Sequence, residues 1–202
     1  FKDKAQIDAT PHWAGAQPGD VIFKDVGGPD GVPDKVIDGL DRVMNEKNNM
    51  PRFIGGFLTN LEYKNFDLSL LFQGATGSVQ YVRAESGEIG NYYKLYADNR
   101  WTPENTESSY PRAWNRDEEY WGSQGNTFWL QNMNYLRLKN FEVGYNLPST
   151  VNKKLGIGNL RIFVNGQNVL TFSEQTLIDP ELQSGTDYPL PRIINGGITL
   201  TF

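Results

Sequence analysis

Apolar and polar residues alternate along five segments of this sequence, each close to the length of about ten residues that a tilted membrane strand needs. The last segment, 192–202, shows the pattern most clearly. Its apolar residues share one face and its small and polar residues share the other: Ile194, Gly196, Ile198, Leu200 and Phe202 against Asn195, Gly197, Thr199 and Thr201. Because successive side chains of a strand point to opposite faces, this segment predicts a strand with one apolar face.

The other four alternating segments are 53–64, 66–74, about 128–147 and 160–172. Only Asn65 separates the first two, so the chain reversal at Lys64-Asn65 predicts a tight hairpin. The segment at about 128–147 holds its apolar residues in two phases: Leu136 and Leu138, then Phe141, Val143 and Tyr145. A β-bulge adds one residue to a strand, so a bulge near Lys139-Asn140 would bring both groups to one face. In 160–172 the phase weakens after Gly166.

The connections between these segments differ greatly in length. One residue at 65 and about a dozen from Pro148 to Asn159 alternate with some fifty from 77 to 127 and about eighteen from 173 to 190. Outer-membrane β-barrels have short periplasmic turns and long extracellular loops. With the C-terminus in the periplasm, both short connections are periplasmic. Aromatic residues lie on the apolar faces at those ends, as an interfacial girdle requires: Tyr63, Phe66, Tyr145 and Phe202.

The pattern therefore predicts an all-β chain, the C-terminal five or so antiparallel strands of a large transmembrane β-barrel with long extracellular loops. Alternating strands with aromatic ends also fit a soluble β-sandwich, and that alternative stays open, although the loop lengths favour the barrel. Five strands are too few to close a barrel, which needs an even number from about eight upward. We therefore expect further strands outside this sequence.

Composition and charge exclude several classes of function. No stretch approaches the roughly 20 apolar residues of a membrane-spanning helix, and the mean hydropathy is −0.54. The net charge of −5 provides no broad cationic field, so we expect no nucleic-acid partner. Cysteine is absent and His12 is the only histidine, which leaves no thiolate or multi-histidine site. We also find no phosphate-binding loop or nucleophile elbow, and we predict that the chain is not an enzyme.

A series of short motifs runs through almost the whole chain. In order they are Pro18–Val26, Met50–Phe53, Glu62–Ser69, Phe72–Gly74, Arg100–Asn105, Tyr110–Arg112, Tyr135–Asn140, Gly144–Pro148, Val164–Asn168, Asp179–Glu181, Tyr188–Arg192 and Leu200–Phe202. Each is weak alone. Their ordered succession resembles the C-terminal part of SusC-like TonB-dependent transporters of Gram-negative outer membranes.

The resemblance implies a barrel of 22 strands with an N-terminal plug, neither of which is complete in this chain. It implies import of large nutrients, powered through TonB by way of the missing N-terminal region and assisted by a SusD-like surface lipoprotein. Oligosaccharides are the leading cargo; the alternatives are peptide import by the same family and a soluble β-sandwich module that binds carbohydrate. The protein would be a multi-pass protein in contact with outer-membrane lipid, and Phe202 would be its barrel-terminal assembly signal.

On this basis the chain divides into two regions. Residues 1–51 form an extracellular loop with an acidic turn rich in glycine and proline. Residues 52–202 form the C-terminal barrel strands, with extracellular loops at about 77–127 and 173–190. The N-terminal plug and the remaining strands lie outside the chain.

Two sets of residues are candidates for binding. Carboxylates closely spaced around glycine turns supply the oxygen ligands of Ca²⁺, so Asp25, Asp30 and Asp34 are the metal candidates. The alternative is a solvated acidic loop held by glycine and proline turns. The 77–127 loop is dense in aromatic residues, which stack on sugars and anchor interfaces. Trp114, Tyr120 and Trp121 are the candidates for substrate or lid contact, against packing in the loop's own core.

Overall fold

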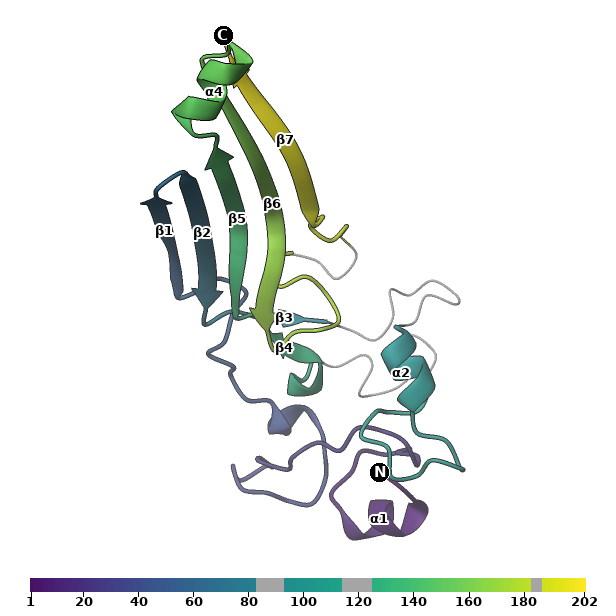
Figure 1. The fold of residues 1–202 in the computed structure, drawn as a ribbon. Helices are drawn as coiled ribbons and strands as arrows, with labels where there is room; N and C mark the ends of the chain where they lie inside the picture. Colours follow the sequence, from purple (N-terminus) through teal and green to yellow (C-terminus); the bar gives the residue numbers. More distant parts are fainter. Residues whose placement is uncertain (83–92, 114–124, 183–186) are drawn as a thin grey trace. The chain divides into compact units, whose positions relative to one another are not determined.

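The computed structural model describes residues 1–82, 93–113, 125–182 and 187–202 (Figure 1). The chain forms two compact units. The loop unit comprises Phe1–Glu46 and Tyr81–Leu130, and the sheet unit comprises Lys47–Gln80 and Gln131–Phe202. None of the described helices is long and apolar enough to cross a membrane.

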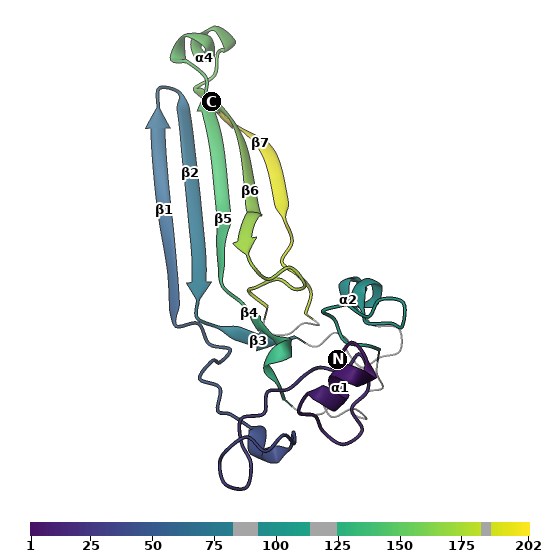
Figure 2. The same cartoon turned by 90° about the horizontal axis from the view of Figure 1, so that it is seen from below.

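The sheet unit is built on one antiparallel sheet of five strands, in the order β1-β2-β5-β6-β7 (Figures 1 and 2). The strands are β1 Phe53–Tyr63, β2 Phe66–Thr76, β5 Tyr135–Asn146, β6 Asn159–Ser173 and β7 Ile193–Thr201. All five predicted segments are therefore strands, and the all-β fold class is confirmed. A short helix, α4 (Ser149–Leu155), lies in the connection from β5 to β6 and ends at Gly156, whose φ of 69° is left-handed.

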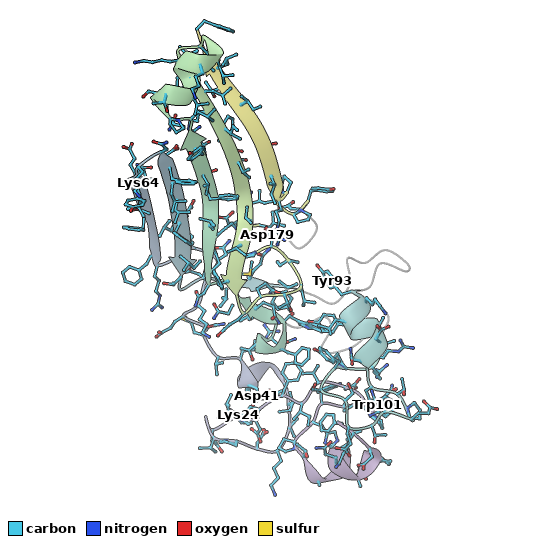
Figure 3. All side chains as sticks on the ribbon, viewed as in Figure 1. Lys24, Asp41, Lys64, Tyr93, Trp101 and Asp179 are labelled. Atoms are coloured by element: carbon cyan, nitrogen blue, oxygen red, sulfur yellow. The ribbon has the colours of Figure 1, made fainter. Side chains whose placement is uncertain are left out.

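The tight hairpin and the bulge are both confirmed. Tyr63 pairs with Phe66, and Lys64, labelled in Figure 3, takes the positive φ of 55° that so short a turn requires. On β2, Leu71 pairs with Asn140 but Phe72 pairs with Leu138, so Lys139 is the extra residue on β5. The register of β5 on β6 shifts at the same place.

The strand predicted at about 128–147 begins only at Tyr135. Residues Thr127–Trp129 form a 3₁₀ turn (η2), because the side chain of Asn126 accepts a hydrogen bond from the N–H of Phe128 and starts the turn. The next residues, β4 (Leu130–Asn132), pair with β3 (Val79–Tyr81) in a separate two-stranded sheet. The alternating pattern therefore predicts a strand that begins too early, because residues 127–132 belong to η2 and to the β3–β4 sheet.

The loop unit has a hydrophobic core of its own, which the alternation pattern does not predict. Among its described residues, the buried apolar ones come from both of its segments: Phe1, Ile7, Trp13, Ile37, Val82, Tyr96 and Trp129. The regular elements described in it are α1 (Lys4–Ala9), η1 (Gly39–Asp41), α2 (Lys94–Asn99) and η2. Two segments expected to be separate loops, 1–51 and 77–127, thus share one core.

Candidate functional site

The five-stranded sheet has one continuous apolar face. Strand register places the following large apolar residues on it, each between 42% and 75% exposed: Phe53, Phe57, Leu61, Tyr63, Phe66, Leu136, Val143, Ile162, Val164, Leu170, Phe172, Ile194, Ile198 and Leu200. Among the described residues no second sheet covers them. An exposed apolar surface of this extent marks a contact with a membrane or with further protein.

The opposite face carries most of the polar side chains of the sheet, beside a few apolar ones such as Ile54 and Leu58, and has a charged cluster near the hairpin end. Arg161 on β6 reaches across β5 and forms an ion pair with Asp67 on β2. Its Nη2 also donates to Glu142 Oε1 at 2.7 Å. The guanidinium lies over Gly144, where an added Cβ would collide with both Arg161 and Asp67. A side chain at Gly144 would therefore have to displace the ends of Arg161 and Asp67 and disturb their ion pair.

Asparagine side chains extend this polar row toward β7. Asn165 on β6 donates to Glu142 Oε2 at 3.2 Å, and Asn195 on β7 donates to Asn165 Oδ1 at 3.2 Å. Side chains from β2, β5, β6 and β7 are thus hydrogen-bonded across one face. The polar side chains of this face thus bond to one another, and in a barrel the water of the lumen would hydrate the rest.

A second charged network lies at the other end of the polar face. Arg137 on β5 is only 2% exposed, and each of its three guanidinium nitrogens donates a hydrogen bond. Nη2 donates to Asp179 Oδ1 at 2.7 Å, Nη1 to Glu181 Oε2 at 2.7 Å, and Nε to Thr171 Oγ1 at 2.9 Å. Lys139 Nζ lies 2.9 Å from Glu181 Oε2. Asp179, labelled in Figure 3, belongs to the segment that follows β6.

A cavity of about 590 Å³ adjoins this network, on the polar side of the sheet unit. Gln73, Tyr135 and Lys139 line it from β2 and β5, and Pro180, Glu181 and Leu182 line it from the segment after β6. None of these residues is among the site residues predicted from the sequence. The signal is present in two of the motifs, Tyr135–Asn140 and Asp179–Glu181, which the fold brings into contact.

Acidic side chains of the 25–41 turn accept hydrogen bonds from the backbone N–H groups of the same turn. Asp25 Oδ2 accepts from Lys35 N at 2.7 Å, and Asp34 Oδ1 accepts from Val36 N at 2.9 Å. Asp30 is exposed at the tip. In the described part of the chain no three acidic or histidine side chains are arranged to hold a metal ion. The Ca²⁺ site stays a prediction.

Asp41 is the central carboxylate of this turn and is not among the predicted ligands. Its Oδ1 accepts from Val26 N at 2.8 Å and from Gly27 N at 3.1 Å. Burial acts to raise the pKa of Asp41, but hydrogen bonds from the backbone N–H groups outweigh it and hold that pKa below its usual range. Asp41, labelled in Figure 3, therefore stabilises the turn as a carboxylate.

The aromatic candidates Trp114, Tyr120 and Trp121 lie outside the described residues, so their role stays a prediction. Other aromatic residues of the same loop pack in the loop unit. Tyr96 is 5% exposed, with its ring 5.1 Å from that of Tyr110 and 5.8 Å from that of Trp129. Burial raises the pKa of Tyr96 to about 12, so its hydroxyl stays protonated at neutral pH.

Comparison with known proteins gives the family. No family model matches the chain. TonB-dependent receptor P3 of Formosa agariphila is 35% identical over 139 residues, which are 68% of this chain and 13% of that protein. Receptor P26 of the same organism is 33% identical over 171 residues, or 76% of this chain and 17% of that protein. TonB-dependent receptor SusC of Bacteroides thetaiotaomicron is 27% identical over 154 residues, or 73% and 15%. The chain belongs to the SusC-like TonB-dependent transporters.

Solved structures of this family agree with the fold. The RagAB peptide importer in its open-open state superposes with a TM-score of 0.64 at 26% identity, over 87% of this chain and 20% of that one. The chain thus spans a fifth or less of the length of each of these four SusC-like proteins. These relatives are named as receptors and importers, not as enzymes. As a SusC-like sheet, the five strands are a piece of an outer-membrane barrel wall.

Proposed function

We propose that this chain forms part of the wall and the extracellular loops of an outer-membrane importer of large nutrients. The complete transporter would be powered through TonB and would work with a SusD-like surface lipoprotein. The observation that supports this most directly is the two-faced sheet: one face is exposed and apolar, as lipid requires, and the other is polar and hydrogen-bonded, as a hydrated lumen requires.

Oligosaccharides are the proposed cargo, and peptides are the second candidate. The second is favoured by a specific observation, the superposition on a transporter whose name is the RagAB peptide importer. The two cargoes share neutral hydrogen-bonding groups, hydroxyls in one and amides in the other. The hydrogen-bonding groups of the polar face therefore do not distinguish the two cargoes.

Uptake by the complete transporter tests the proposal. The transporter and its lipoprotein would be expressed in a host that lacks them, and cells would be given fluorescent neutral oligosaccharides or fluorescent tryptic peptides of casein. We expect oligosaccharide uptake that disappears when TonB is deleted. Uptake of peptides alone would favour the second cargo. Uptake of neither, from a transporter shown to be inserted in the outer membrane, would contradict the proposed function.

We also propose that the C-terminus and the two short connections are periplasmic, and that 1–51, 77–127 and 173–190 are extracellular. The β1–β2 turn, α4 and the C-terminus all lie at one end of the sheet (Figures 1 and 2). Phe202, 93% exposed, directly follows β7 at that end, two residues after Leu200 of the apolar face, where a barrel-terminal assembly signal is expected.

Single cysteines test this orientation, because the chain contains none of its own. Met44 is 95% exposed in the loop unit, and Lys154 is exposed in α4. With a membrane-impermeant maleimide we expect Met44→Cys to be labelled in intact cells. Lys154→Cys should be labelled only after the outer membrane is permeabilised, and the parent protein supplies the background. The reverse order of labelling would show that the assigned orientation is wrong.

A further inference from the structure

Two sequence motifs that are far apart in the chain meet in one buried charged network. Arg137 and Lys139 belong to β5, and Asp179 and Glu181 belong to the segment that follows β6. We call residues 174–182 the strap. The strap lies outside the strands, yet its two carboxylates are only 10% and 13% exposed, because they lie against Arg137. The network therefore fixes the strap on the polar face of the sheet.

The strap is also shaped locally to present these carboxylates. Asp179 Oδ1 accepts from Glu181 N at 3.0 Å, and the carbonyl of Asp179 accepts from Leu182 N at 3.0 Å. This turn directs both acidic side chains toward one guanidinium. The two cations and two carboxylates sum to zero charge, so the network is neutral as well as hydrogen-bonded.

The strap forms one wall of the cavity of about 590 Å³ beside the network. The rest of the lining combines neutral hydrogen-bonding side chains, from Asn49, Gln73, Ser78 and Tyr135, with apolar ones such as Met50, Ile54 and Met133; the Tyr135 hydroxyl is hydrogen-bonded to Glu181. Among the described residues that line the cavity, the charged ones are Lys139 and Glu181, which are paired with each other. A charged ligand would have to separate this pair or remain unpaired in a partly buried site, whereas a neutral one finds donors and acceptors.

We propose that Arg137 is a positioning residue that holds the strap in place, and that the cavity bounded by the strap is a subsite for an uncharged, hydrogen-bonding unit of the transported nutrient. This inference rests on the proposed function. It adds a charge selectivity: neutral units are accepted in preference to acidic ones, and Glu181 is the residue that keeps Lys139 from attracting an anion.

Binding to matched probes tests the subsite. The complete transporter with its lipoprotein would be titrated with two pairs of ligands: peptides that differ only by Asn or Asp, and oligosaccharides that differ only by a neutral sugar or its uronic acid. Wild type should bind the neutral member of at least one pair more tightly. In Glu181→Gln, Lys139 loses its carboxylate while Arg137 keeps Asp179. The acidic member should then gain about tenfold relative to the neutral one, the effect of one charge-assisted hydrogen bond.

Two controls make the outcome decisive. Glu62→Gln removes a carboxylate from the same polar face at the hairpin end, far along β1 from the cavity, and should leave the binding ratio unchanged. In Arg137→Met, hydrogen exchange of the 174–182 amides should become faster and both members of a pair should bind more weakly. Unchanged exchange there, or an unchanged ratio in Glu181→Gln, would overturn the subsite alone. If wild type bound no probe, the proposed function would fail as well.

Discussion

Replacing Arg137 with methionine should lower the free energy of unfolding of the complete transporter by about 3–5 kcal/mol, the range measured when one partner of a buried ion pair is removed. The reason is that Asp179 and Glu181 are largely buried against this guanidinium. Without Arg137, Asp179 loses its cation and Glu181 retains only Lys139. Urea unfolding in detergent micelles, followed by tryptophan fluorescence, would measure the change.

The double variant Arg137→Met, Asp179→Asn is the matched control. It removes one cation and one carboxylate together and keeps the Lys139–Glu181 pair, so no uncompensated charge stays buried. We expect it to recover most of the lost stability, because neutral groups of similar size replace the buried charges. If the single and double variants were equally unstable, packing rather than charge would explain the role of Arg137.

Replacing Phe57 with arginine should destabilise the barrel in a lipid bilayer by about 2–4 kcal/mol, the effect of an arginine at mid-depth on the lipid face. Phe57 lies near the middle of β1, on the apolar face, and is 64% exposed in the chain. Its exposed ring would be replaced by a guanidinium that must leave water for hydrocarbon. Unfolding from vesicles, followed by the shift in electrophoretic mobility of the folded barrel, would measure the effect.

The adjacent residue provides the comparison. Leu58 is 59% exposed, almost as much as Phe57, but it points to the opposite face. In the barrel that face borders the lumen, so Leu58→Arg should change stability by no more than about 0.5 kcal/mol. Equal effects at the two positions would mean that the two faces of β1 have been assigned wrongly.

The strands and their faces can be predicted because both depend on local alternation. The bulge at Lys139 is predictable for the same reason, since the change of phase between Leu138 and Phe141 requires one extra residue. Alternation fails at Phe128 and Trp129, because the cap at Asn126 turns the chain before the strand begins. The periodicity of apolar residues gives no indication of a cap that a single side chain forms.

The sites depend on contacts between distant segments, which no local pattern contains. The motifs that hold Arg137 and Asp179 are both visible in the sequence, but their pairing follows from the β5–β6 register and from the turn after β6. Gly144 begins the visible motif Gly144–Pro148, but nothing in that motif indicates that an ion pair between β2 and β6 lies over this residue. The acidic turn is also visible, yet its central residue, Asp41, is indistinguishable in the sequence from the other aspartates around it.

The split composition of the loop unit has a consequence for the order of folding. Its two parts, 1–46 and 81–130, are separated in sequence by β1 and β2. The hairpin joins its own ends, since Val79 N donates to Asn48 O at 2.9 Å and Arg52 N to Thr76 O at 2.9 Å. Once the hairpin has formed, the entropy lost in bringing the two parts together is that of a short loop. We therefore expect the β1–β2 hairpin to form before the loop unit folds and to nucleate its folding.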